Sequence, residues 1–538
     1  MNRPLAKSLL LSMVFACNAV TVTSVHAQLA QNLLIGNAKA IALGNAVTAD
    51  PPGIDSIHFN PAGLAKIKDR QIHLKFIAGN ADITGEFTSN PEYDQLLADN
   101  QMEGQDSMAN STSTIEAFAV YLPGSGVTEL PVIAAPVGGM STQLSENLTF
   151  GTAAYAPLIL GYTRADDDPG RFYGKEVGMS RITYLSPTIG WQVNESLSIG
   201  AGIGISYFGV GIDLDYRAAN LLLGGIKSIT DAACLGVDNG IVFEGVPINL
   251  CGGELSPFES LFTLQVDVTE AFSPTFNLGI LWEPTEWFSL GFVYQSEAAD
   301  RLEGDVNVLL SENAVGFAQG LADSNPLLNL FVDLLEITDN NGQIQSGGHI
   351  DLKMPAHASI GTSIRITPSL KFNVDYKWTQ TSVWDEFAFI IDDGIPLLGL
   401  LGAIGIDGVG SNEIIIPRGY EDATNFAYGL EYQWDDRTAF RFGYEPRESG
   451  IPDDKLDFLI PLGDFDLYGV GVSYRMDKDT VVDASFAYAK SDQFIPTGSS
   501  TNGNDLRADN FVYNPSAGLD VRSVIEIMVF EFSYQSTF

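Results

Sequence analysis

The sequence predicts an all-β protein, a transmembrane β-barrel of 14 antiparallel strands, on three observations. From about Arg70 onwards apolar residues alternate with small or polar ones, the pattern of strands with two unlike faces. No apolar run after the N-terminal leader reaches the roughly 20 residues of a membrane-spanning helix. Only 18% of the residues are charged and 54 of 538 are glycine, which leaves a large soluble β protein or a membrane barrel.

The positions of the aromatic residues favour the membrane barrel, because a soluble sandwich would alternate as well. Tyrosine and tryptophan crowd the strand ends beside the short turns, where hydrocarbon meets lipid headgroups. The residues concerned are Trp191, Trp282, Trp287, Tyr432, Trp434 and Tyr474. Short turns alternate with long excursions, as periplasmic turns and external loops do in such barrels.

Residues 1–27 are predicted to be a signal peptide. Arg3 and Lys7 precede a short apolar stretch, and Val25-His26-Ala27 supplies small residues for cleavage before Gln28. A secreted barrel is expected in the outer membrane of a Gram-negative cell as a multi-pass protein. The net charge is −39 at pH 7, and −41 without the two basic residues of the leader. This charge argues against nucleic acid as a partner.

A compact segment, residues 28–69, precedes the barrel of residues 70–538. It lacks the alternation of apolar and polar residues that is typical of strands. Its Ala- and Gly-rich part begins at Asn37 and is compatible with a short helix up to about Asp50. The prolines that follow, and the run Asn60-Pro61-Ala62-Gly63, favour turns. A closed barrel offers no second layer, so the lumen is the expected place for this segment, as a small helical hatch.

The two cysteines of the mature chain, Cys234 and Cys251, are expected to form a disulfide, because they are an even pair in a secreted chain. A metal site is the alternative, but no histidine lies nearby. The sequence contains no H-E-x-x-H motif, no G-x-S-x-G elbow and no phosphate-binding loop. We therefore expect no enzyme, no cofactor and no metal.

Three expected external loops are more apolar than loops usually are, and they lie near 213–270, 298–347 and 383–422. In the second, Leu327, Leu330 and Leu334 fall at helical spacing, with Phe331 beside them. Two interpretations remain open. The helices bury these side chains against one another as a lid, or they expose them as a landing surface for an apolar ligand.

Four cations are candidates for contacting a ligand inside the barrel. If the apolar residues Ile350, Leu352 and Met354 face lipid, the residues that alternate with them point into the lumen. The same argument applies to the polar residues that alternate with apolar ones on the following strands. The candidates are Lys353, His357, Lys377 and Arg441. Each is expected either to meet a ligand carboxylate or to pair with an inward acid. The acids considered are Asp351, Asp375 and Glu431.

Three segments carry a resemblance to a known family. They are GNAVTADPPGIDSIHFNPAGLAKI, the run Leu352-Lys353-Met354-Pro355, and the C-terminal stretch from DDRTAFRFGYEP to VVDASFAYAK. With them the mature chain resembles the FadL family of outer-membrane long-chain fatty acid transporters. The resemblance implies a 14-stranded barrel with an N-terminal hatch in the lumen. It also implies ligand capture at external loops, transfer to a site beside the hatch, and sideways release at an inward kink of the third strand.

The resemblance also assigns positions to these features. The kink is expected at Ala156 and Pro157, with Asn60-Pro61-Ala62-Gly63 placed against it. The aromatic last residue, Phe538, looks like the signal that the outer-membrane assembly machinery reads. The chain departs from the fatty acid transporters at the end of the fifth strand, where residues 207–216 contain no lysine or arginine.

The predicted function is passive uptake of long-chain fatty acids or similar hydrophobic molecules. Neutral hydrocarbons or aromatics in place of fatty acids, and a general diffusion porin, are the alternatives. The expected partners are a hydrophobic small molecule, the lipid of the outer membrane and the assembly machinery, with the chain acting as a monomer.

Overall fold

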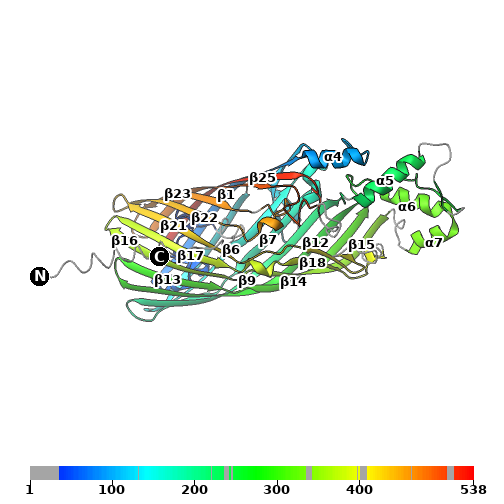
Figure 1. Cartoon of the computed structure of the whole chain (residues 1–538). Coiled ribbons are helices and arrows are strands. Elements are labelled where there is room, and N and C mark those ends of the chain that lie inside the picture. The colour runs from blue at the N-terminus through cyan, green and yellow to red at the C-terminus, as the bar shows by residue number, and fades with distance from the viewer. Residues whose placement is uncertain are drawn as a thin grey trace.

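The computed structural model forms a closed barrel of 14 antiparallel strands, which confirms the predicted fold class (Figure 1). It describes residues 36–130, 133–219, 221–234, 241–243, 246–334, 342–396, 398–399, 409–461, 463–505 and 514–538. The predicted signal peptide, the first residues of the hatch segment (28–35) and most of the apolar run at 397–406 lie outside the described residues.

The wall follows chain order and closes where the first and last strands pair, from Gln71 opposite Thr537 to Thr88 opposite Asp520. Several of its strands are interrupted part-way. In order, the segments of the wall are β1 (Arg70–Thr88), β5 (Ile133–Ser145), β6 (Leu148–Thr163), β7 and β8 (Glu176–Leu185, Thr188–Gln192), β9 (Leu197–Tyr216), β12 (Phe262–Thr285), β13 and β14 (Phe288–Gln295, Ala298–Leu310), β15 and β16 (Gln343–Met354, His357–Thr367), β17 and β18 (Leu370–Thr379, Glu386–Ile391), β20 and β21 (Glu413–Pro417, Ala423–Gln433), β22 (Thr438–Arg447), β23 (Phe465–Arg475), β24 (Thr480–Ile495) and β25 (Asp520–Thr537).

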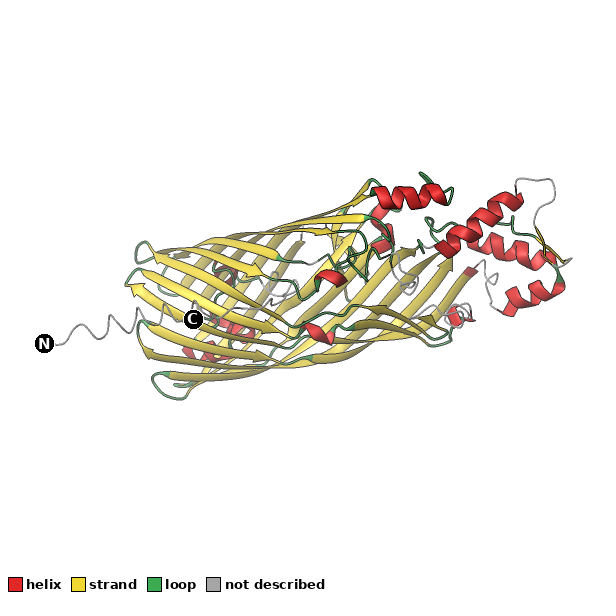
Figure 2. Ribbon diagram, in the orientation of Figure 1, coloured by secondary structure: helices red, strands yellow, loops and turns green. Residues whose placement is uncertain are grey.

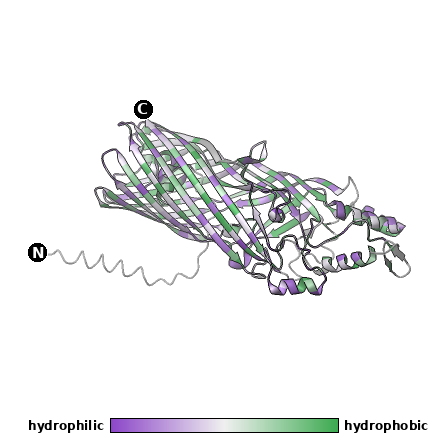
Figure 3. Cartoon of the chain, turned by 90° about the horizontal axis from the view of Figure 1, so that it is seen from above, coloured by the Kyte–Doolittle hydropathy of each residue, from purple (hydrophilic) through white to green (hydrophobic). Residues whose placement is uncertain are grey.

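Near the short turns and the C-terminus, which we call the turn end, the barrel is apolar outside and polar inside. On β1, Leu74 and Phe76 are exposed on the outer face, whereas His73 and Lys75 are buried in the lumen. The predicted aromatic residues at strand ends, such as Trp191 and Trp434, are exposed here too. The bands of opposite hydropathy along the strands are visible in Figure 3. This part therefore carries the lipid-facing belt.

Towards the other end, which we call the helix end, the two faces exchange character. On β14, Arg301, Glu303 and Asp305 are exposed, whereas Leu302 and Val306 are buried inside. Charged side chains avoid a lipid-facing surface. The strands therefore extend beyond the lipid belt and enclose an apolar interior there.

Irregularities in the strands accompany this exchange. In β12 the pairing with β9 shifts by one residue between Glu270 and Ser273. Leu264, Val266 and Val268 lie inside on one side of the shift. On the other side the residues of the same parity are exposed outside, among them Phe276, Leu278, Ile280 and Trp282. A β-bulge has this effect because side chains alternate with a period of two.

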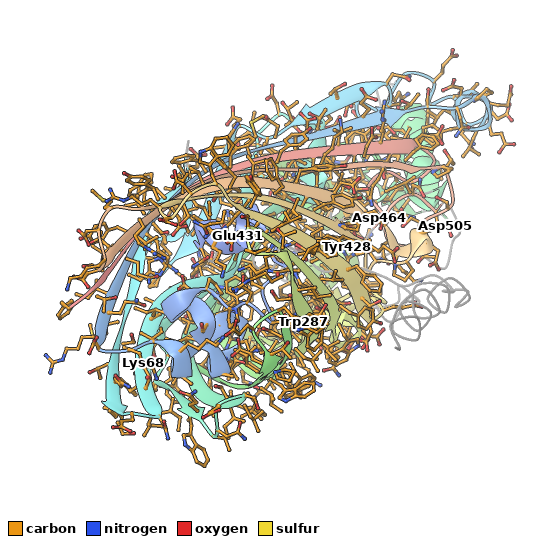
Figure 4. The ribbon with its side chains drawn as sticks, turned by 90° about the vertical axis from the view of Figure 1, so that its left-hand side faces the viewer. Lys68, Trp287, Tyr428, Glu431, Asp464 and Asp505 are labelled. Atoms are coloured by element: carbon orange, nitrogen blue, oxygen red, sulfur yellow. A yellow bond between two sulfur atoms is a disulfide. The ribbon has the colours of Figure 1, made fainter. Side chains whose placement is uncertain are left out.

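The hatch consists of four short elements inside the ring of strands: α2 (Ala38–Ala42), η1 (Gly53–Asp55), α3 (Ser56–Phe59) and η2 (Pro61–Lys66) (Figure 4). The Asn37 side chain caps α2 by accepting from the Ala40 amide at 2.9 Å. Asn60 caps η2, whose first residue is Pro61. Gly44 has φ +59°, and a Cβ there would approach the Tyr444 amide to 2.6 Å, so glycine lets the hatch touch the wall.

At the helix end, several helices project beyond the strands (Figure 2). They are α4 (Pro91–Asp99), α5 (Leu221–Cys234), α6 (Glu312–Ser324) and α7 (Pro326–Leu334). A small sheet of β10 (Ile241–Phe243) and β11 (Val246–Ile248) accompanies them. In the described part of the chain, no helix combines the length and the hydropathy needed to cross a membrane. The strands of the wall extend into the three ranges that were predicted to be external loops. The connections between these strands are therefore shorter than predicted, and they comprise residues 217–261, 311–342 and 392–412.

Candidate functional site

Buried charges fix one side of the hatch to the barrel wall. Asp55, 2% exposed, accepts from Lys75 Nζ at 2.8 Å and from Asn37 Nδ2 at 2.7 Å, and its carboxylate lies 3.2 Å from His73 Nδ1. Burial alone would raise the pKa of Asp55, but Lys75 and His73 outweigh burial and hold the pKa well below its usual value. Asp55 is therefore a permanent anion that ties the hatch to β1.

A second set of charges ties the hatch to β17 and β21. The Asp50 carboxylate bonds to Lys39 at 2.9 Å and to Lys371 of β17 at 2.5 Å. Lys371 also lies 2.8 Å from Glu431 of β21, which bonds in turn to Arg441 at 2.7 Å. The group joins residues more than 300 positions apart and fixes the hatch to the far wall.

Polar contacts to neighbouring strands complete this anchoring. Asn45 donates to Glu445 of β22 at 3.0 Å, and the Thr48 amide donates to Asp375 of β17 at 2.8 Å. On the β12 side, Asn60 Nδ2 donates to the Ile280 carbonyl at 3.1 Å. The hatch is thus bonded to β1, β12, β17 and β22.

Towards β6 the hatch surface is apolar at mid-height. Ile54, Ile57 and Leu64 pack in one cluster with Ala153 and Tyr155 of β6. The His58 ring contacts the Tyr155 ring there, with the two centroids 5.1 Å apart. Burial lowers the pKa of His58 to about 3, so its ring is neutral near pH 7. The backbone carbonyls of Ile57 and His58 accept from Asn277 of β12 and Gln295 of β13, so what the hatch presents to β6 at this height is apolar side chains.

β6 is irregular where it faces this apolar side. Opposite β7, Tyr155 pairs with Thr183 but Leu158 pairs with Arg181, so Ala156 and Pro157 form a one-residue bulge. Pro157 has no amide hydrogen to donate to a ladder. Opposite β5, the pairing ends at Gly138 and Ala154.

The wall is therefore open between β5 and β6. Beyond Ala154, β5 remains paired with β1 as far as Ile133, whereas β6 remains paired with β7 alone. Among the described residues, β6 regains a neighbour on that side only at Tyr162, which pairs with Phe118. At this height the outer face carries Phe76 and Phe532, so the gap lies within the lipid-facing belt.

A hairpin of β3 (Ala117–Leu122) and β4 (Gly126–Leu130) covers the outer wall beside the gap. The Tyr121 ring lies over Gly209 of β9, where a Cβ would come within 2.2 Å of it. The Tyr121 amide donates to Ser180 Oγ at 3.0 Å, and its hydroxyl donates to Asp267. The hairpin therefore confines the gap on the side of the helix end.

Two cavities lie near this opening. The hatch-side pocket is bordered by Ile57, His58, Tyr155, Pro157, Arg181, Thr183, Ser186, Thr188, Gly202, Ile203, Gly204, Thr275, Phe276, Asn277, Gln295, Ser296, Met354 and Pro355. The apolar chamber is bordered by Leu160, Val177, Gly178, Met179, Val210, Ile212, Leu214, Leu264, Ile350, Leu352, Phe387, Phe389, Ile416, Leu459 and Ile460. Their volumes are about 60 and 30 Å³, below the roughly 300 Å³ of small-molecule pockets, so transit of a ligand requires side chains to move.

Comparison with known proteins agrees with this architecture. Residues 16–538 match the family described as outer membrane protein transport protein (OMPP1/FadL/TodX). The chain belongs to this family. It is thus an outer-membrane β-barrel of a family of transport proteins, and the predicted resemblance and localisation are confirmed.

Individual relatives are distant in sequence. The chain is 24% identical to the long-chain fatty acid transport protein of Escherichia coli O6:H1 over 347 residues, which are 64% of this chain and 67% of that protein. A Pseudomonas aeruginosa FadL homologue has a similar fold, with a TM-score of 0.64, 18% identity, and 96% of this chain and 100% of that one covered. For the Ralstonia pickettii toluene transporter TbuX the TM-score is 0.56, with 15% identity and 94% and 99% covered. At such identities the structural likeness establishes the fold alone.

One predicted lumen residue of this FadL-family chain lies on the wrong face. Lys353 is exposed on the outside, whereas Ile350, Leu352 and Met354 are buried in the interior. The prediction took apolar residues to be lipid-facing, but these three lie towards the helix end, where the apolar face is the inner one. His357 does point inward, because the strand is interrupted at Pro355-Ala356 and the alternation changes phase there.

The other candidate cations point inward and are bonded to acids. Lys377 lies 2.6 Å from Glu445, and Arg441 bonds to Glu431 and to Asp483 at 2.7 and 2.6 Å. Asp351, considered as an inward partner, is outside and pairs with Arg301. The inward pairs join strands of the wall to one another, β17 to β22 and β22 to β21 and β24.

The predicted placement of Asn60-Pro61-Ala62-Gly63 against the kink of β6 is also wrong. Asn60 and Pro61 approach Gly279 of β12, where a Cβ would come within 2.1 and 2.7 Å of them, and Pro61 and Ala62 approach Gly200 of β9. The residues that border the kink are Ile57 and His58, which share the hatch-side pocket with Pro157. The motif shapes the hatch on the anchored side.

At the helix end, Leu327, Leu330 and Leu334 of α7 are 75%, 65% and 70% exposed. The Phe331 side chain lies outside the described residues. Cys234 and Cys251 form a disulfide, with Cα atoms 5.7 Å apart, which ties α5 to the segment before β12. In the described part of the chain no group of metal ligands is found.

The buried ion pair of Arg181 and Asp300 was not predicted from the sequence. Arg181 Nη1 lies 2.9 Å from Asp300, which also accepts from Ser273 Oγ at 2.6 Å. Arg181 borders the hatch-side pocket next to the apolar chamber. In the sequence, Arg181 stands out as a charged residue within an otherwise mostly apolar strand. Its partner Asp300 is 119 positions away, so the spacing of residues could not reveal the pair.

We predict that Asp55→Asn loosens the hatch. The change leaves Lys75 and His73 without their carboxylate, and breaking a buried pair costs about 3–5 kcal/mol. The depressed pKa means that wild-type Asp55 contributes its stability above the ordinary pKa of about 3.9 and loses it only as pH falls through the lower folded value. At neutral pH, brief conducting events in planar bilayers should become more frequent. Asp436→Asn, in an exposed turn, is the control, and equal conductance in both variants would contradict the anchoring role.

Proposed function

We propose that this protein is a passive uptake channel for hydrophobic molecules, which leave the barrel sideways between β5 and β6. The observation that carries the proposal is the open stretch of wall directly beside the apolar side of the hatch. At this height the outer surface is lipid-facing, so a hydrophobic molecule would pass from the interior into the membrane without entering water. The chain has no nucleotide-binding motif, and a concentration gradient suffices to drive the flux.

The exposed leucines of α7 supply a landing surface at the opposite end of the path. An apolar stripe on a helix that projects into water has a cost unless it meets an apolar partner. The apolar chamber lies between this surface and the hatch-side pocket, so capture, passage and release follow one direction along the barrel. Long-chain fatty acids and neutral hydrocarbons or aromatics both have the chemistry for this path.

A general diffusion porin fits the observations less well. The hatch lies in the lumen and is bonded to several strands of the wall, among them β1, β12, β13, β16, β17 and β22, which argues against a wide aqueous pore. We propose no catalytic role, because the family to which the chain belongs is one of transport proteins. Exposed Phe538 at the turn end is available to the assembly machinery, and the chain is proposed to act as a monomer surrounded by outer-membrane lipid.

We predict that removing the bulge of β6 blocks uptake. Deleting Ala156 and changing Pro157 to Val lets β6 continue its alternation and donate hydrogen bonds towards β5. The gap should then close, and uptake of a hydrophobic fluorescent probe into cells should fall at least tenfold.

The control for this variant is Pro274→Val, which replaces an exposed proline of β12 on another side of the barrel without changing the register of that strand. Uptake by the control should remain within twofold of wild type. If the β6 variant folds, as judged by heat-modifiable migration, and still takes up the probe normally, release does not occur through this gap.

A second prediction concerns capture. Changing Leu327, Leu330 and Leu334 together to Ser removes the exposed apolar stripe and should raise the probe concentration for half-maximal uptake several-fold, with the maximal rate unchanged. Asn329→Ser with Asp333→Ser alters the exposed polar side of the same helix and serves as the control. An unchanged concentration dependence would remove α7 from the path.

A further inference from the structure

The connection between β22 and β23 turns into the barrel instead of projecting from it. We call its residues 449–461 the inner loop. Connections at a barrel end are ordinarily polar and solvated, whereas the apolar side chains of this one are at most 7% exposed. These side chains are Ile451, Leu456, Phe458, Leu459 and Ile460.

The inner loop crosses the lumen on the helix-end side of the apolar chamber. Leu459 and Ile460 line the chamber together with wall residues of strands from β6 to β20. The Leu459 carbonyl accepts from the Tyr162 hydroxyl of β6 at 3.0 Å. On the β1 side, the Phe458 ring lies over Gly85, where a Cβ would come within 2.5 Å of it. The loop thus reaches from β22 and β23 to the opposite wall.

Aromatic rings close the remaining space around the inner loop. The centroid of the Phe458 ring lies 5.6 Å from that of Phe87 and 5.7 Å from that of Tyr173, both edge to face. All three side chains are fully buried. In the described part of the chain, the loop and these rings therefore cover the chamber towards the helix end. A molecule that arrives from the exposed leucines of α7 has to displace this cover.

A buried ion pair fixes the inner loop to the wall. The Asp457 carboxylate lies 2.5 Å from Nη1 of Arg418, which directly follows β20, and both side chains are buried. Asp457 Oδ1 also accepts from the amides of Leu459 and Ile460 at 3.0 and 3.1 Å. One carboxylate therefore shapes the turn that lines the chamber and ties that turn to the barrel.

The connection between β24 and β25 supplies a fixed frame beside this ion pair. Asn504 Nδ2 donates to the carbonyls of Pro496 and Leu519 at 2.8 and 3.0 Å, which pins the connection to the ends of both strands. Next to Asn504, a Cβ on Gly503 would lie 3.6 Å from the Cβ of Asp457. Asp457 thus lies against a part of the chain that is bonded to the wall independently of the inner loop.

We propose that the inner loop is an outer gate of the uptake path and that the Asp457–Arg418 pair is its latch. The structure describes the closed gate, in which the pair is formed and the loop covers the chamber. A ligand enters the chamber when the pair separates and the loop moves aside. The path then has one gate at each end of the lumen, the inner loop and the hatch. This inference rests on the proposed uptake function and adds a second barrier to it.

The test replaces the latch by a disulfide. In Asp457→Cys with Gly503→Cys, the Cβ separation of 3.6 Å suits a disulfide, and Cys234 and Cys251 are already paired with each other. Uptake of N-phenyl-1-naphthylamine into cells by the oxidised variant should be at least tenfold below uptake by the same variant after dithiothreitol. Wild-type protein with and without dithiothreitol is the control for reduction of the native disulfide. Equal uptake by the oxidised and reduced variant, with the new disulfide confirmed by mass spectrometry, would overturn the gate.

A second measurement tests the gate without uptake. In purified full-length protein that carries Leu160→Cys in the chamber, a positively charged methanethiosulfonate should label the new thiol at least tenfold faster when Arg418→Gln removes the latch. Arg301→Gln, at an exposed arginine, is the matched control and should leave the labelling rate unchanged. Equal labelling rates in the two variants, both folded as judged by heat-modifiable migration, would overturn the gate. If wild-type protein takes up no probe, the uptake function fails, and the labelling rates still decide whether the gate exists.

Discussion

The unequal attachment of the hatch is the constraint on which the rest of the structure depends. On the sides of β1, β12, β17 and β22 it is bonded through groups such as the buried pair Asp55–Lys75 and the half-buried pair Asp50–Lys371. Towards β6 it offers Ile54 and Ile57 to an apolar cluster. Breaking buried ion pairs is far more costly than sliding one apolar side chain past another. The path that we propose for a ligand therefore runs along β6.

The wall is weakened at the same place. The bulge at Ala156-Pro157 ends the pairing of β6 with β5 beside the apolar side of the hatch, and the β3–β4 hairpin limits the opening from outside. In the proposed path these two features act together, because an open wall beside the ion-paired side of the hatch would give a ligand no exit. The interior accordingly divides into an apolar chamber for the ligand and a polar, ion-paired region that closes the rest of the lumen.

Much of the fold could be predicted from the sequence. Strands that face lipid show apolar residues at every second position, and aromatic residues gather at their ends. The face of a given residue was harder to predict. Phe276 faces the lipid, whereas Ile350 faces the apolar chamber. Both residues belong to strands with the same alternation of apolar and polar residues, so the alternation alone does not show which face of a strand is the outer one. One-residue bulges and the break at Pro355-Ala356 also exchange the inward and outward positions along a strand. For these reasons Lys353 was predicted to face the lumen, although it lies on the outer face. Partners such as Asp50 and Lys371 meet only through barrel closure, so spacing could not reveal them.

The most direct test of the sideways path is photolabelling with a hydrophobic probe that carries a diazirine. During uptake into liposomes that contain the purified protein, the path described above predicts labels on Tyr155 to Leu160 of β6 and on Ile57 and His58 of the hatch. Labels on Ile41 and Ala42, which face β23 on the bonded side, would show that the molecule passes straight through the lumen and would contradict the account.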